Sequence, residues 1–135
     1  MVYLTRRDSF SAAHRLWSNE LSEAENIALY DKCANLNGHG HNYILEVTVR
    51  GVPDPRTGMV LNLTALKQAM NEQVINWVDH KNLNYDVPWL AGCIPTAEML
   101  AIAFWERLAR ALPSSLLYEV RLYETEHNIA SYRGE

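Results

Sequence analysis

The sequence lacks the features that mark secreted and membrane-spanning proteins. Only two cysteines, Cys33 and Cys93, occur in 135 residues, too few for a disulfide framework, so both are expected to be free thiols in a reducing compartment. No segment approaches the ~18 consecutive apolar residues of a membrane span. The first residues, MVYLTRRDSFSAAHR, have no apolar leader core. We therefore expect no membrane partner and a soluble, cytoplasmic protein.

Clustered positive charge is also absent. The 12 Lys and Arg residues are scattered among 16 Asp and Glu, and the net charge is -4. Nucleic-acid binding requires a basic surface that neutralises phosphates, so no nucleic-acid partner is expected. With 48% hydrophobic residues, the chain has enough apolar side chains for one core. Residues 1–135 are predicted to form a single domain.

Period-two patterns predict two strands within the first 50 residues. The even positions of Val2–His14 share a face, and residues 43–49 alternate apolar and polar side chains. Residues 18–32 are polar and predict a surface loop with a helical turn at its centre. The segment PDPRTG predicts a turn from which MVLNL, residues 59–63, returns as the hairpin partner of 43–49.

Two amphipathic helices and a closing hairpin follow. Apolar residues from Leu66 to Val78 recur at helical spacing, with Asn62 or Thr64 as N-cap. A second helix starts after Pro95, with Thr96 as its cap, and is stopped by Pro113. Strands at 116–125 and 129–132 complete an α+β fold, predicted as a four-stranded antiparallel sheet with both helices on one face. Its short open edges favour oligomerisation.

The segment CANLNGHGHNY suggests a metal site. On an extended backbone His39 and His41 point the same way, and Gly40 lets the chain lie close to what they hold. A catalytic zinc typically takes three protein ligands, and His14 has the strand parity to be the third. The pattern HxH is also frequent in turns, so spacing alone leaves a zinc site and a pair of surface imidazoles equally open.

Cys33 lies six residues before His39. A thiol beside a metal ion has a lowered pKa and could act as a general base near neutral pH. The alternative is an inert, half-buried thiol. Cys93 has no comparable neighbours.

Two acidic positions are also candidates. Asp79 precedes His80 at the expected end of the first helix, where the pair could transfer protons or the imidazole could simply suit the helix dipole. Glu124 has the strand parity of Leu122, so its carboxylate points toward an apolar side unless it escapes to water. A ligand with two parallel N–H donors would satisfy it.

These motifs together resemble the 6-pyruvoyltetrahydropterin synthase family. The similarity runs in order through FSAAHRL, CANLNGHGHNY, DPRTGMVLNLTALK, DHKNLN, PTAEML and YETEHNIASYRGE. It covers nearly the whole chain and is far more specific than HxH alone.

The resemblance implies roles for nine residues. The implied catalytic zinc (Zn2+) ligands are His14, His39 and His41; the implied proton-transfer group is Cys33, Asp79 and His80; and the implied pterin contacts are Glu124, Thr96 and Glu98. It also implies a tunnelling fold (T-fold), in which the sheets of three subunits close a barrel and two trimers stack as a homohexamer. In the family, the Asp–His pair comes from a neighbouring subunit.

The implied reaction converts 7,8-dihydroneopterin triphosphate to 6-pyruvoyltetrahydropterin with loss of triphosphate, a step toward tetrahydrobiopterin. One alternative is 6-carboxytetrahydropterin synthase of queuosine synthesis, which releases acetaldehyde. Five residues separate Cys33 from His39, a longer spacing than in the carboxy enzymes. A folate-synthesis branch has glutamate near the cysteine position, so Cys33 argues against it. A non-catalytic pterin-binding T-fold protein would not need the proton-transfer residues.

Overall fold

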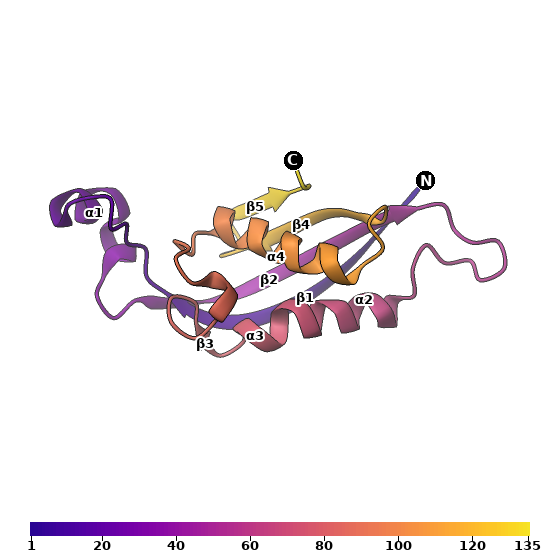
Figure 1. Ribbon diagram of the computed structural model, residues 1–135, viewed down its shortest axis with the longest axis horizontal. Helices are drawn as coiled ribbons and strands as arrows, with labels where there is room; N and C mark the ends of the chain where they lie inside the picture. The colour runs from indigo at the N-terminus through magenta and orange to yellow at the C-terminus, as the bar shows by residue number, and fades with distance from the viewer.

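The computed structural model describes all residues, 1–135, and has an α+β fold built on one sheet (Figure 1). The strand order is β3-β1-β2-β4-β5. All neighbours are antiparallel except β3, which pairs parallel to β1. The strands are β1 (Val2–His14), β2 (His39–Gly51), β3 (Lys81–Asn82), β4 (Leu117–Tyr123) and β5 (Ile129–Tyr132).

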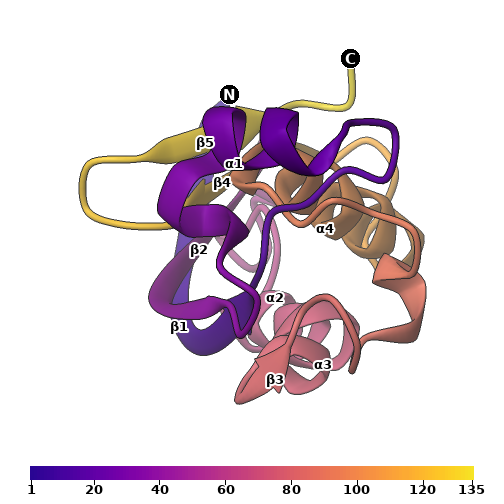
Figure 2. The ribbon, with the colours of Figure 1, turned by 90° about the vertical axis from the view of Figure 1, so that its left-hand side faces the viewer.

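The main helices cover one face of the sheet. Viewed from one end, α2, α3 and α4 lie on the same side of the strands, whereas α1 lies at the end of the molecule (Figure 2). A π-helical turn connects α2 to α3, and two short 3-10 turns complete the helical segments. Their bounds are α1 (Glu23–Tyr30), 3-10 (Asp31–Ala34), α2 (Leu63–Met70), π (Asn71–Ile75), α3 (Asn76–Val78), 3-10 (Pro88–Leu90) and α4 (Ala97–Ala111).

The predicted helix starts are confirmed by their caps. The side chain of Asn62 accepts a hydrogen bond from the backbone N–H of Thr64 at 2.8 Å, which identifies Asn62 as the N-cap of α2. Thr96 accepts from the N–H of Met99 at 3.2 Å at the start of α4. The capped starts fix where each amphipathic stripe meets the sheet.

Two predictions about the sheet are wrong. The sheet has five strands and is mixed, because residues 81–82 add a short parallel strand beside Ala12 and Ala13. Residues 59–63 do not form a hairpin with β2, since β1 and β4 occupy both edges of that strand. The predicted turn does exist, with the N–H of Gly58 donating to the carbonyl of Asp54 at 2.7 Å, but the chain then enters α2.

The polar segment 18–32 contains a complete helix rather than a single turn. Ser22 and Glu25 form a reciprocal capping box at the start of α1. Asn26 is fully buried and its amide donates to the carbonyls of Ser18, Leu21 and Ser22. These local polar contacts hold a segment with few apolar residues, which explains why periodicity understated it.

The long β1–β2 ladder sets the parity of the site. His14 lies opposite His39, and Ala12 lies opposite His41. The face covered by the helices carries Phe10 and Tyr43, whose rings stack with centroids 4.8 Å apart. The three histidines therefore continue the core face of two adjacent strands to its end.

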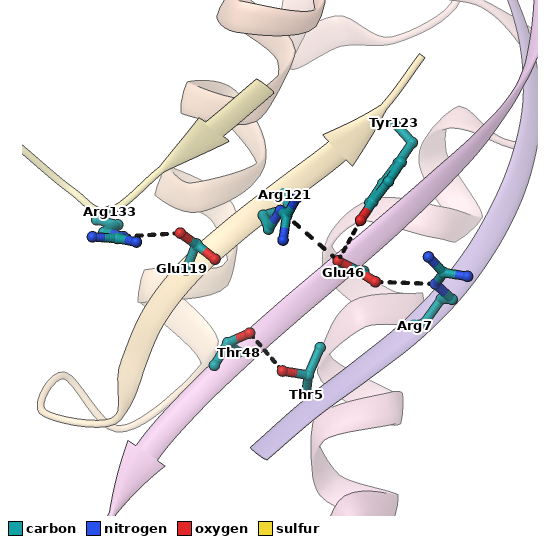
Figure 3. A network of polar contacts seen from close by, with 8 residues as sticks. All are labelled: Thr5, Arg7, Glu46, Thr48, Glu119, Arg121, Tyr123 and Arg133. Carbon is teal, nitrogen blue, oxygen red and sulfur yellow. Dashed lines mark hydrogen bonds and ion pairs between the residues drawn. The ribbon is translucent and has the colours of Figure 1, made fainter. Parts of the chain in front are cut away.

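The opposite face of the sheet is polar. Arg7 donates to Glu46 at 3.0 Å, the Tyr123 hydroxyl donates to the same carboxylate at 3.2 Å, and Arg133 pairs with Glu119 (Figure 3). This face has no second hydrophobic layer in the chain. No helix is both long and apolar enough to cross a bilayer.

Candidate metal and active site

Three histidines meet at the end of the core face. One ligand nitrogen from each of His14, His39 and His41 lies within 4.8 Å of the other two. Their rings are mutually edge-on, with centroids 4.7 to 5.0 Å apart. His14 is fully buried and the other two are partly buried. The structure thus brings together the three residues that strand parity grouped.

The hydrogen bond of His14 to Pro95 leaves its Nε2 lone pair free beside His39. His14 Nδ1 is 2.8 Å from the carbonyl of Pro95, and because a carbonyl only accepts, Nδ1 carries the proton and Nε2 carries the lone pair. His14 Nε2 is 3.2 Å from His39 Nε2, close to the ~3.3 Å between two nitrogens on one tetrahedral ion. His41 Nε2 is buried without a hydrogen-bond partner. The residues fit a metal ion.

Burial prepares these imidazoles to act as ligands. Desolvation lowers the pKa of His14, although the Pro95 carbonyl opposes the shift. Desolvation also lowers the pKa of His41, against the attraction of Glu124. Both rings therefore favour the neutral form that binds metals.

Glu124 joins the histidine cluster to a large cavity. Its Oε1 lies 3.8 Å from His41 Nε2, and it lines a cavity of about 740 Å³ together with Thr96 and Glu98. The backbone N–H of Glu124 donates to the carbonyl of Asn128, which fixes the backbone of Glu124 at the β4–β5 turn. The three predicted pterin-contact residues thus share one cavity.

Cys33 is held near the end of β1. It lies in the 3-10 turn after α1, and its carbonyl accepts the N–H of Leu16 at 2.8 Å. Burial raises the pKa of the Cys33 thiol, and the negative charges of Glu124 and Asp31 raise it further. The surrounding protein alone thus opposes the thiolate, so a thiolate would depend on a nearby cation.

Asp79 and His80 form a separate pair at the edge of β1. Asp79 Oδ1 lies 2.9 Å from His80 Nδ1 and accepts the N–H of Ser11 at 3.0 Å. The Ser11 bond is the main reason that the pKa of Asp79 is lowered. His80 has a positive φ of 61° and its N–H donates to the Ser11 carbonyl. This backbone geometry turns the chain so that the pair faces outward.

The pair and the Glu124 cavity do not meet within one chain. The His80 side chain is 82% exposed and lines a groove of about 460 Å³ with Ser11, Ala13, Asn42 and His41 of the histidine cluster. Ser11 and Ala13 have the opposite strand parity to His14. Neither Asp79 nor His80 lines the cavity of Glu124.

Two groups near the histidines were not found from the sequence. The Pro95 carbonyl orients His14, and the buried Tyr43 hydroxyl lies 3.3 Å from His14 Nδ1. Tyr43 shares the parity of His39 and His41, so the strand pattern could have identified it. A backbone carbonyl reached across 81 residues leaves no signal in the sequence.

Comparisons with known proteins match the family that the sequence motifs resemble. Residues 3–135 match the family described as 6-pyruvoyl tetrahydropterin synthase. The chain is 56% identical to the 6-pyruvoyl tetrahydrobiopterin synthase of Poecilia reticulata, covering 98% of this chain and 90% of that protein. It is 52% identical to the human protein of the same name, covering 98% and 91%.

Solved structures agree at the level of the fold. The chain is 47% identical to the Caenorhabditis elegans 6-pyruvoyl tetrahydropterin synthase, with a TM-score of 0.95, covering 99% of this chain and 96% of that chain. A Plasmodium falciparum protein with this name is 18% identical with a TM-score of 0.72 over 97% and 96% of the two chains, a likeness of fold alone. The full-length matches and the histidine cluster lead to one conclusion: this chain belongs to the 6-pyruvoyl tetrahydropterin synthase family.

Proposed function

We propose that this protein is a zinc-dependent lyase that converts 7,8-dihydroneopterin triphosphate to 6-pyruvoyltetrahydropterin and triphosphate, a step toward tetrahydrobiopterin. The observation that carries the proposal is the position of Glu124, between the histidine cluster and the 740 Å³ cavity. A bicyclic pterin in that cavity would have its side chain directed toward the histidines. The full-length relatives named as this synthase support the assignment.

His14, His39 and His41 would hold the zinc. Their three nitrogens leave a fourth tetrahedral position for a ligand. The ion would supply Lewis-acid polarisation of the substrate side-chain oxygens, which acidifies the adjacent C–H bonds. The protein's part is to keep the imidazoles neutral and oriented, through burial and the bond from His14 Nδ1 to Pro95.

Glu124 would anchor the pterin ring. An ionised carboxylate accepts two parallel hydrogen bonds, which matches the adjacent N–H donors on the aminopyrimidinone edge. Its side chain is 19% exposed, so bound substrate would shield these two hydrogen bonds from water. Thr96 and Glu98 line the same cavity at the start of α4 and would contact the ring from the helix side.

Cys33 would remove and return protons on the substrate side chain. The oxidation of the side chain and the reduction of the pyrazine ring balance within the substrate, so no external redox cofactor is needed. The thiolate form requires a cation, because Glu124 and Asp31 raise the pKa of the free thiol. Asp79 would orient His80 as a second proton carrier through their 2.9 Å contact.

The assembled enzyme would be a homohexamer of two stacked trimers. β1 has an outer sheet neighbour only at Ala12 and Ala13, and β5 ends the sheet on the other side. These two open edges on opposite sides suit a closed ring of identical chains. A neighbouring chain would then bring its Asp79 and His80 toward the Cys33 of the first.

Product identification tests the proposal. Zinc-loaded protein is incubated anaerobically with 7,8-dihydroneopterin triphosphate, and the pterins are identified by mass spectrometry. We expect a pyruvoyl product and one released triphosphate for each turnover. A carboxy product with acetaldehyde would keep the site and overturn the reaction, and pterin binding without turnover would overturn the enzymatic role.

A further inference from the structure

The segment that carries Asp79 and His80 is an interrupted helix. Between α2 and α3, residues 71–75 form a π-helical turn in which the N–H of Asn76 donates to the carbonyl of Asn71. An α-helix would pair Asn76 with Glu72 instead. Such one-turn interruptions occur frequently at functional sites. The π turn sets the direction in which the side chains after it point around the helix axis.

Side chains take up carbonyls of the widened turn. The indole N–H of Trp77 donates to the Glu72 carbonyl at 3.0 Å. Arg107, on α4, donates from Nε to the Gln73 carbonyl at 2.6 Å. The second bond is long-range and joins the π turn to a different helix.

The Arg107 guanidinium is also held between two indole rings. It lies 5.2 Å from the ring centroid of Trp77 and 4.6 Å from that of Trp89. Trp89 packs edge-on against the fully buried Phe104. A cation between two aromatic faces is held more firmly than one in a surface ion pair. Arg107 therefore connects the π turn to the core.

The π turn also supports the Asp79–His80 pair, which follows it in the chain. The N–H of Asp79 donates to the carbonyl of Ile75, the last residue of the π turn, at 2.9 Å. One residue more or less in a helix rotates the following side chains by about 100°. Reversion to an α-helical turn would carry the Asp79 carboxylate away from the N–H of Ser11.

We infer that Arg107 is a positioning residue for the Asp79–His80 pair: it holds the π turn in place and so fixes the direction of the His80 imidazole. The inference rests on the proposed role of this pair in proton transfer. Arg107 itself touches neither the histidine cluster nor the cavity of Glu124 in the contacts described above. Its effect should therefore appear in the rate of the proton step rather than in substrate or metal binding.

The test compares Arg107→Met with Arg110→Met, an exposed arginine on the same helix. We expect Arg107→Met to lower kcat about 10-fold with KM and zinc content unchanged, since small misplacements of catalytic groups reduce rate strongly. Arg107→Lys keeps the charge but not the planar donor, should give an intermediate loss, and replaces the Met variant if that variant does not fold. Arg110→Met should retain the wild-type kcat.

A double-mutant cycle separates this inference from the proposed function. If Arg107 acts through His80, adding Arg107→Met to His80→Gln should lower kcat by less than about 2-fold further. Wild-type kcat in Arg107→Met beside an impaired His80→Gln would overturn the inference, as would an equal loss in both backgrounds. If His80→Gln is fully active, the proton-relay proposal fails, and the His80 imidazole NMR signals decide: a shift in Arg107→Met supports the positioning role, and unchanged signals contradict it.

Discussion

The histidine cluster and the Asp79–His80 pair differ in how completely one chain builds them. The cluster is buried on the helix-covered face, and its ligand atoms already lie within 4.8 Å of one another. His80 is exposed at the edge of β1 and lines a groove that His41 shares, beside the partly buried Asp79, whose carboxylate accepts the Ser11 N–H. Both contain an imidazole, yet only the first is in contact with the Glu124 carboxylate.

This difference separates the geometry that one chain builds from the geometry that we propose assembly supplies. A 13-residue ladder fixes His14 opposite His39, with His41 two residues further along the same strand as His39, so the candidate metal site is built within one chain. Neither Asp79 nor His80 lines the cavity of Glu124 in its own chain. If both act on one substrate in the cavity of Glu124, we expect the second region to come from another copy. The predictions below test each region in turn.

The largest effect is expected at the metal site. His39→Ala removes one of three ligands, and we expect zinc content to fall below one ion in ten chains and turnover to drop at least ~1,000-fold. Metal analysis and the turnover assay measure this. His80→Ala is the matched control for metal content, because its imidazole belongs to the other region and should leave zinc bound. Retained zinc in His39→Ala would contradict the ligand assignment.

Cys33→Ala should abolish most turnover while binding is preserved. Loss of a general base lowers the rate about 100- to 10,000-fold, whereas zinc content and pterin affinity should stay at wild-type values. The turnover assay measures the loss of rate, and calorimetry with a pterin measures the retained affinity. Cys93→Ala, the other partly buried thiol, is the control and should remain active. Normal turnover by Cys33→Ala would show that another group is the base.

Glu124→Gln should weaken pterin binding and also change Cys33. The lost charge-assisted bond predicts about a 10- to 100-fold weaker Kd. Because Glu124 raises the pKa of the Cys33 thiol, its neutralisation should lower that pKa and speed alkylation of Cys33 by iodoacetamide in metal-free protein at pH 8. An unchanged alkylation rate would indicate that the carboxylate does not act on the thiol.

The smallest effect is expected in the pH dependence of stability, because the two regions should titrate in different pH windows. The folded pKa values of His14 and His41 are lowered, so the unfolded chain binds more protons and metal-free protein loses stability as pH falls below about 6.5. The pKa of Asp79 is also lowered, so its contribution persists until pH falls below about 3.9.

Thermal unfolding at successive pH values separates these windows. Asp79→Asn should leave the decline between pH 7 and pH 5 unchanged and alter only the acidic end. A change in the upper window would mean that Asp79 is coupled to the histidine cluster within one chain.

Strand parity predicted the core of the site because parity is local. The alternation that placed His14 with Phe10 and Ala12, and His39 with His41, depends only on the backbone period and an antiparallel neighbour. Glu124 was found in the same way, as a carboxylate on the apolar side of its strand. The caps at Asn62 and Thr96 were likewise local hydrogen bonds.

Features that depend on distant partners were not predicted. Residues 59–63 have a strand-like composition, but β4 takes the edge of β2 that a hairpin would need. The π turn is held by Arg107 from another helix, and periodicity counted residues 66–78 as one regular helix. The outward direction of Asp79 and His80 follows from a positive φ and the bonds to Ser11, which no spacing rule contains.

Complementation between two inactive variants tests most directly whether the two regions act on one substrate from different chains. Cys33→Ala and His80→Gln proteins are unfolded together, refolded as a mixture with zinc, and assayed. Random mixing of chains in a symmetric assembly should restore about one quarter of wild-type turnover, because one interface in four then carries both intact groups. Activity no higher than that of the separate variants would contradict the account and place both groups in the site of a single chain.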